Sequence, residues 1–242
     1  MSRGVDARGG AGASGAPLGR PRLHLRETGS VLDRARRAAG AGAPHGTLVT
    51  AGLQTAGRGR QGRAWAAPAG RALLLALIVR EPDPLLSLRA GLAAADLAGA
   101  DARVKWPNDV LLDGRKVAGI LVEGRPQERW AVVGVGINAA VDPADLPLDV
   151  RDRAGTLGLA PSQLDDALRD LLGALERWLG EAPEAVLAAL RERDALLGAP
   201  VAWAGGSGTG AGITDTGALR IRHADGTESS LEAGEVHLRA AG

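Results

Sequence analysis

The stretch VKWPNDVLLDGRKVAGILVE, residues 104–123, contains two strand-like runs separated by a turn signal. The runs cover residues 104–112 and 116–123, and Asp113-Gly114 between them is a dipeptide typical of two-residue hairpin turns. Apolar runs on both sides of such a turn predict two neighbouring antiparallel strands. This hairpin is the starting point for the rest of the fold.

Strand and helix patterns alternate on both sides of the hairpin. Ser30 is a suitable N-cap for the first helix. In the longest helical segment, apolar residues recur at i, i+3, i+4 and i+7 and form one face. Because hairpins alternate with crossover helices, we expect an α+β fold with a mixed or antiparallel sheet and flanking helices. The expected strands are 21–25, 47–51, 72–79 and 130–137, and the expected helices are 30–39, 84–98, 162–179 and 184–197.

Both ends of the chain differ from this middle part. After Gly198 the sequence consists of short runs with turns at Thr216-Gly217 and Asp225-Gly226, which predict a small β-barrel over residues 199–242. Residues 1–20 are rich in Gly, Ala and Arg and predict a disordered tail. Residues 21–198 therefore form the expected main domain.

Composition excludes several classes of function. The 29 basic and 28 acidic residues give a formal net charge of +1, which argues against nucleic-acid binding through whole-surface charge. The absence of cysteine excludes disulfides, a thiol nucleophile and Cys-type zinc sites. The longest purely apolar run, residues 72–79, is far shorter than the ~20 residues that span a bilayer. The tail also lacks the apolar region of a signal peptide, so we expect a cytoplasmic protein without a membrane partner.

Two residue types are rare enough to attract attention. Lysine occurs only at Lys105 and Lys116, and asparagine only at Asn108 and Asn138, in a chain that otherwise uses arginine as its cation. A compact ammonium and a planar guanidinium are not interchangeable, and an amide both donates and accepts hydrogen bonds. These four residues are candidates for function, and chance survival in an arginine-rich chain is the alternative.

Two segments match the glycine pattern of dinucleotide-binding folds, residues 57–62 and 134–139. That pattern requires the glycines to open a helix whose N-terminus faces a pyrophosphate. Here each match is followed within a few residues by proline, and neither opens a predicted helix. The chain also lacks the P-loop pattern, so any nucleotide must be bound in another way.

The first of these segments suits the binding of an anion. In residues 57–63, the Arg/Gly loop, arginines alternate with glycines, so guanidinium groups and accessible backbone amides lie together and suit a phosphate or carboxylate. Gln54 precedes the loop and Trp65 follows it. The alternatives are a mobile basic loop and an RGG-like nucleic-acid contact. The residues concerned are Gly57, Arg58, Gly59, Arg60, Gly62 and Arg63.

The opening hairpin carries the second candidate cluster. Residues 105–109 place an ammonium, an indole, a proline bend, an amide and a carboxylate side by side. Lys116 lies across the hairpin and can face the same cleft, although a surface turn with an incidental ion pair is the alternative. Gly119, Gly134 and Gly136 are positions where backbone can approach a ligand, or where strands merely bulge or pack closely.

Together these segments carry a family resemblance. Residues 54–65, 105–109, 116–121 and 134–138, in this order, resemble the successive signature motifs of biotin protein ligases. The resemblance covers about residues 22–240 and implies the fold shared with class II aminoacyl-tRNA synthetases, followed by an SH3-like β-barrel. No helix-turn-helix pattern precedes the motifs, which implies the monofunctional type that does not bind DNA.

The resemblance also implies the reaction. Biotin and ATP form biotinyl-5′-adenylate with release of pyrophosphate, and a lysine of a biotin carboxyl carrier protein then takes the biotin. ATP implies Mg²⁺ bound mainly through phosphate oxygens, so no metal-binding residues are expected in the protein. A monomer or a homodimer is compatible with this chemistry.

Residue roles follow by the same resemblance. Lys116 bridges the biotin carboxylate and the α-phosphate, Arg60 belongs to the loop that closes over the adenylate, and Asp109 positions the incoming amine or accepts its proton. These three are the expected catalytic residues. The expected biotin contacts are Ser30, Gln54, Gly57, Arg58, Gly59, Arg60, Trp65, Lys116, Gly119 and Gly134. The expected ATP contacts are Arg58, Arg60, Arg63, Asn108, Lys116 and Asn138.

One segment departs from the family. Biotin ligases usually carry Ser-Thr-Asn at the start of the first helix, whereas this chain has Ser30-Val31-Leu32-Asp33. Each lost polar partner costs roughly 1 to 3 kcal/mol, so biotin affinity is expected to fall by about one to two decades unless backbone amides compensate. With no Phe or Tyr in the chain, an aromatic contact to adenine has to come from Trp106, Trp130 or Trp178.

Other functions fit parts of the pattern. A lipoate or octanoate ligase or transferase shares the fold, although the Arg/Gly loop and the Lys116 motif favour biotin. A nucleic-acid-binding regulator would use the Arg/Gly loop and the tail. A non-catalytic sensor of biotin or its adenylate would explain Val31 and Leu32.

Overall fold

The computed structural model describes residues 17–238 of the 242-residue chain. Most of the predicted disordered tail, residues 1–16, lies outside the described residues. None of the helices between residues 17 and 238 is both long and apolar enough to cross a membrane.

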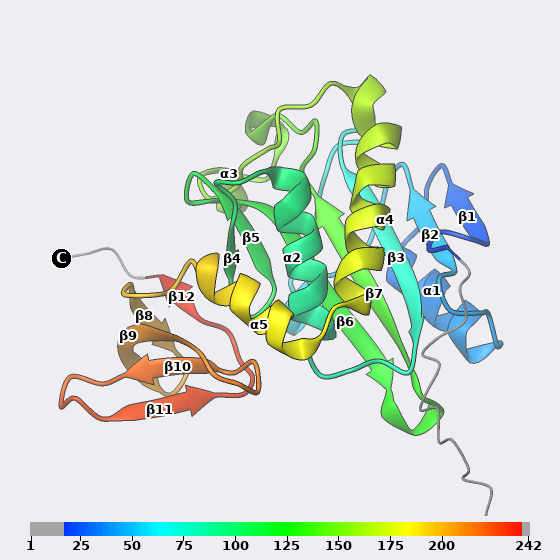
Figure 1. Cartoon of the computed structure of the whole chain (residues 1–242). Coiled ribbons are helices and arrows are strands. Elements are labelled where there is room, and N and C mark those ends of the chain that lie inside the picture. Colours follow the sequence, from blue (N-terminus) through cyan, green and yellow to red (C-terminus); the bar gives the residue numbers. More distant parts are fainter. Residues whose placement is uncertain (1–16, 239–242) are drawn as a thin grey trace, which may run out of the picture.

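A seven-stranded sheet forms the centre of the molecule (Figure 1). Strands β1 and β2 pair in parallel, and every other pair in this sheet is antiparallel, which confirms the predicted mixed sheet. The opening hairpin is also confirmed, with Asp113 and Gly114 at positive φ in its turn. In spatial order the strands are β1 (Arg22–Leu25), β2 (Leu48–Ala51), β3 (Leu73–Arg80), β7 (Trp130–Ile137), β6 (Arg115–Arg125), β5 (Asp109–Leu112) and β4 (Arg103–Lys105).

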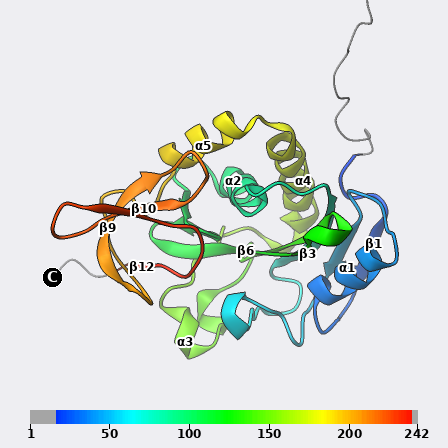
Figure 2. The ribbon, with the colours of Figure 1, turned by 90° about the horizontal axis from the view of Figure 1, so that it is seen from below.

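Helices cover both faces of this sheet (Figure 2). One face carries α2 (Leu86–Ala98), α4 (Leu164–Gly180) and α5 (Pro183–Glu192), and the other carries α1 (Val31–Gly40) and the short α3 (Leu148–Arg151). Single turns of 3-10 helix complete the list: η1 (Arg60–Gly62), η2 (Pro126–Glu128), η3 (Pro143–Asp145) and η4 (Pro161–Gln163).

Strand β3 shows why the sheet needs two layers of helices. Leu75 and Leu77 belong to the apolar cluster that contains α2 and α4, whereas Ala76 and Ile78 belong to the cluster under α1. Successive side chains of a strand point to opposite faces, so a strand that is apolar throughout must be covered twice. The uninterrupted apolar run of the sequence is therefore a central strand buried on both faces.

A second, antiparallel sheet of five strands packs beside the first. Its apolar residues Val201, Leu219 and Ile221 belong to the same cluster as the central sheet. Trp106, 3% exposed, joins the two sheets because its indole Nε1 donates to the Gly217 carbonyl at 3.0 Å. In spatial order the strands are β11 (Glu228–Leu231), β10 (Leu219–Arg222), β9 (Gly206–Ile213), β8 (Pro200–Trp203) and β12 (His237–Leu238).

Two predicted elements have wrong bounds. The helix expected at 184–197 ends at Glu192. The chain turns there because the Asp194 side chain accepts the Leu196 N–H, and because the backbone of Asp194 forms a parallel β-bridge with Val104. The strand expected at 104–112 is two antiparallel strands, β4 and β5, since Pro107 lies in a turn between them and has no N–H for a ladder.

Trp106→Phe should lower the free energy of unfolding by about 1 to 3 kcal/mol, because the Gly217 carbonyl loses its partner in a buried place. Urea denaturation measures the change. Trp203 is a half-buried indole of the second sheet, so Trp203→Phe is the matched control and should lower the free energy of unfolding by less. An equal loss in both variants would contradict a special role for the Trp106 hydrogen bond.

Candidate active site

The site is built on glycines of the two central strands. Gly119 of β6 lies opposite Gly136 of β7, and Gly134 of β7 lies opposite Leu121. A Cβ at Gly136 would lie 2.5 Å from the Trp65 ring, and one at Gly119 would lie 2.9 Å from it. The Trp65 indole therefore rests directly on backbone. In this structure close packing accounts for both glycines, and the contact of Gly119 with biotin stays a prediction.

The Leu32 side chain lies against Gly134, the neighbouring glycine of β7. A Cβ at Gly134 would lie 2.8 Å from the Leu32 side chain, which is 4% exposed. Leu32 replaces the asparagine that the resemblance leads one to expect. The glycine at 134 is thus used to accommodate an apolar side chain of α1.

Lys116 and Asp109 meet beside Trp65. The Lys116 Nζ lies 2.6 Å from Asp109 Oδ1 and 5.6 Å from the centroid of the Trp65 ring. Asp109 also pairs with Lys105 at 3.7 Å. The expected proximity of Lys116 and Asp109 across the hairpin is confirmed. An ammonium held by one carboxylate next to an aromatic wall suits a small anionic ligand.

Lys105 is the more buried of the two lysines. Burial lowers the pKa of its ammonium, and neighbouring Lys116 lowers it further, whereas the Asp109 carboxylate raises it. Two lysines around one carboxylate leave an excess of positive charge, which an anionic substrate would neutralise.

The Arg/Gly loop has a defined shape of its own. The Gly59 N–H donates to the Arg63 carbonyl at 2.6 Å, and the Trp65 N–H donates to the Gly57 carbonyl at 2.9 Å. Gln61 and Gly62 both have positive φ, which closes the turn between them. The residues that follow bring Trp65 onto the glycines of the sheet.

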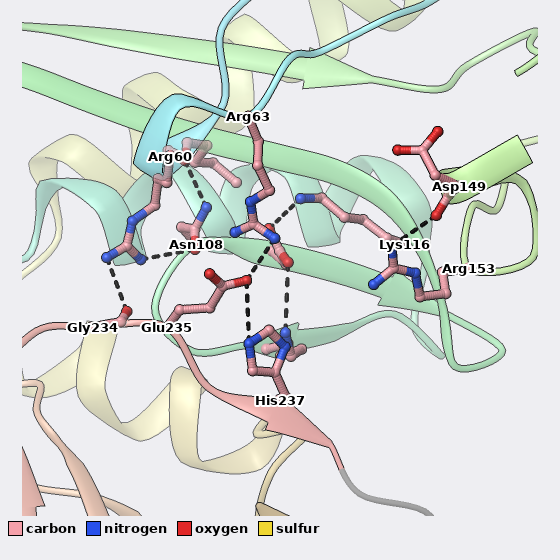
Figure 3. A network of polar contacts seen from close by, with 12 residues as sticks. Arg60, Arg63, Asn108, Lys116, Asp149, Arg153, Gly234, Glu235 and His237 are labelled. Atoms are coloured by element: carbon pink, nitrogen blue, oxygen red, sulfur yellow. Dashed lines mark hydrogen bonds and ion pairs between the residues drawn. The ribbon is translucent and has the colours of Figure 1, made fainter. Parts of the chain in front are cut away.

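Two arginines of the loop bind side chains from other elements. Arg58 pairs with Asp33 of α1 and with Glu123 of β6, both at 2.9 Å. Arg60 donates to the Asn108 side chain at 3.0 Å and to the Gly234 carbonyl at 2.9 Å (Figure 3).

The third arginine contacts the second sheet. Arg63 pairs with Glu235 at 2.6 Å (Figure 3). The sequence did not indicate the partners of these arginines, which are Asp33, Glu123, Gly234 and Glu235. They lie between 25 and 174 positions from their partners, and nothing in the spacing of the motifs marks them.

Two further predicted residues, Ser30 and Asn138, have buried polar side chains, and a third, Gln54, is half-buried. Ser30 occupies the N-cap position of α1, but its hydroxyl caps nothing and has no hydrogen-bond partner. Instead the Gln54 Oε1 accepts the Val31 N–H at 2.8 Å. Asn138 donates to the Gly155 carbonyl at 3.0 Å and leaves its Oδ1 without a partner. Unpaired buried polar atoms are costly unless a ligand pairs them, so Ser30 and Asn138 remain candidates for binding.

A surface groove of about 480 Å³ lies beside α1, lined among others by Asp33, Arg36 and Trp130. It contains neither Lys116 nor Trp65. The chemistry of Lys116 and Asp109 therefore lies elsewhere, over the glycines of β6 and β7.

Known proteins are similar to this chain in sequence and in fold. Residues 37–139 match the biotin/lipoate A/B protein ligase family. The biotin–[acetyl-CoA-carboxylase] ligase of Mycobacterium tuberculosis is 36% identical over 236 residues, which cover 88% of this chain and 87% of that protein. The chain belongs to the biotin/lipoate A/B protein ligase family.

Two further relatives allow the fold and the chain length to be compared. The solved structure of the Aquifex aeolicus biotin protein ligase in complex with biotin and ATP is similar with a TM-score of 0.74 and 26% identity, over 92% of this chain and all of that chain. The bifunctional ligase/repressor BirA of Bacillus subtilis is 38% identical over 149 residues, which cover 57% of this chain and 46% of that protein. The match thus spans about half the length of that relative.

Gly136→Ala should displace the Trp65 indole, because the new methyl group would lie 2.5 Å from the ring. We expect a shift in tryptophan fluorescence that is absent when the same change is made in a Trp65→Phe background. Gly173→Ala in α4, where a Cβ meets open space, is the control and should leave the spectrum unchanged. An unchanged spectrum for Gly136→Ala would show that Trp65 does not rest on this strand.

Proposed function

We propose that this protein is a biotin–protein ligase that forms biotinyl-5′-adenylate from biotin and ATP and transfers biotin to a lysine of a biotin carboxyl carrier domain. The observation that carries the proposal is the Lys116 ammonium, 2.6 Å from Asp109 and beside Trp65, in a chain of this family. The complex of the Aquifex relative with biotin and ATP supports both small-molecule substrates.

The first step joins two anions. A carboxylate oxygen of biotin attacks the α-phosphorus of ATP, and pyrophosphate leaves. Negative charge accumulates between the carboxylate and the α-phosphate, where the Lys116 ammonium stabilises it. Mg²⁺ held by the phosphate oxygens would neutralise the leaving pyrophosphate. Between residues 17 and 238 no three His, Asp or Glu side chains gather to hold a metal on their own.

The second step transfers the acyl group. The amine of the carrier lysine attacks the acyl carbon of the adenylate, and AMP leaves. Asp109 is positioned to take the proton of the amine while Lys116 stays charged. The adenylate is a mixed anhydride that water hydrolyses, so it has to be covered until the carrier arrives.

The Arg/Gly loop supplies that cover. Arg58, Arg60 and Arg63 are proposed to meet the adenylate or the phosphates of ATP, and Arg60 already contacts Asn108. Ser30, Gln54 and Leu32 line the end of the site nearest α1, where the ring system of biotin is proposed to bind. The second sheet is proposed to correspond to the SH3-like barrel, with residues 21–198 as the catalytic domain and 199–242 as the C-terminal one.

Lipoate is the competing acid, because the matched family includes lipoate ligases. The test is exchange of labelled pyrophosphate into ATP by the purified protein with Mg²⁺ and biotin, lipoate or octanoate. Exchange with biotin is expected. Exchange with lipoate or octanoate alone would contradict the proposed substrate.

Lys116→Ala should reduce biotin-dependent exchange by roughly 100-fold to 1,000-fold, the usual effect of removing one group that stabilises transition-state charge. Arg115→Ala removes the adjacent exposed cation of β6 and should leave the rate nearly unchanged. Lys116→Arg should rescue little, since a planar guanidinium does not match the compact ammonium. Near wild-type exchange by Lys116→Ala would overturn the role of Lys116.

A further inference from the structure

The far end of the chain reaches the Arg/Gly loop. The Gly234 carbonyl accepts a hydrogen bond from Arg60 at 2.9 Å, and the Glu235 carboxylate pairs with Arg63 at 2.6 Å (Figure 3). The two arginines belong to the motifs that mark the family resemblance, but Gly234 and Glu235 do not. Both come from the segment that leads into β12 of the second sheet.

This segment is fixed to the body of the protein. Val236, next to Glu235, is 1% exposed and belongs to the main apolar cluster. His237 then pairs with Ala202 in the β12–β8 ladder. Glu235 is thus held at its backbone on the side where Arg63 approaches.

The charge around Glu235 favours a carboxylate at this position. Its side chain is 21% exposed and faces Arg63, with His237 at 3.7 Å. It is also close enough to raise the pKa of Lys105, against the effect of burial. Without this carboxylate, Arg63 and Lys105 would repel each other across a partly buried space.

The loop needs such an anchor. Its backbone hydrogen bonds, from Gly59 to Arg63 and from Trp65 to Gly57, join residues of the loop and its flank to one another. They fix its shape but not its position over the sheet. The start of the loop is tied to the segment before α1, because the Ala56 N–H donates to the Gly29 carbonyl at 2.8 Å. Beyond Ala56, its position depends on the contacts of its three arginines and of Trp65.

We infer that Glu235 is a positioning residue: it holds Arg63 and thereby keeps the Arg/Gly loop in place over Lys116 and Asp109. The second sheet therefore completes the catalytic site through a contact made by its last segment. The consequence for the adenylate rests on the proposed function, whereas the consequence for the loop does not.

Hydrogen–deuterium exchange tests the loop directly, without any substrate. Glu235→Gln should speed exchange in peptides that carry the Gly59 and Arg63 amides by about twofold to fivefold, with strands β9 and β10 unchanged as the internal control for folding. Glu232→Gln, an exposed carboxylate of the same segment, is the matched control and should change nothing. Arg63→Gln should loosen the loop as Glu235→Gln does. Unchanged loop exchange in both variants would overturn the inference.

A double-mutant cycle tests whether Glu235 acts through Arg63. Glu235→Gln should release adenylate into solution several times faster than the wild type, yet add nothing in an Arg63→Gln background. Fully additive effects would mean that Glu235 acts by another route and would overturn the inference. If exchange changes in the loop but no acid supports pyrophosphate exchange, the positioning role stands and the proposed function fails.

Discussion

The structure depends on the contact between the Trp65 indole and the bare backbone of β6 and β7. Side chains at Gly119 and Gly136 would collide with the ring, and both strands have glycine where Trp65 packs on them. The contact holds the end of the Arg/Gly loop and places an aromatic ring beside Lys116. One indole and one ammonium therefore lie side by side over the sheet, 5.6 Å from Nζ to ring centroid.

Electrostatics shape the rest of the site. Lys105, Lys116, Arg60 and Arg63 gather around Asp109, Asn108 and Glu235, whereas Arg58 lies further along β6 at Glu123. Mutual repulsion between these cations would open the site if nothing compensated. Asp109 compensates the lysines, and Asp33, Glu123 and Glu235 compensate the arginines, each from a different element. The substrates proposed for this site are anions, which would bind where the cations lie together. Four carboxylates, one of them from the second sheet's last segment, hold these cations in place when no ligand is bound.

The sequence was sufficient for the mixed sheet, the hairpin turn at Asp113-Gly114, and the position of Lys116 on the same side as Asp109, because these depend on short-range patterns. It was insufficient for contacts between distant segments: the 174 positions from Arg60 to Gly234 carry no periodicity that links them. Helix ends set by tertiary contact, such as the one at Glu192, also escaped prediction. Ser30 was predicted at its correct place as N-cap, yet the capping atom comes from Gln54, which no local rule indicates.

The most direct measurement is a crystal structure of the protein with biotin and a non-hydrolysable ATP analogue. We predict the biotin carboxylate within hydrogen-bond distance of the Lys116 Nζ, with the acyl chain along Trp65 and the ring system toward Ser30 and Gln54. Ligand bound instead in the groove beside Arg36 and Trp130, with Lys116 still paired to Asp109 alone, would contradict the account.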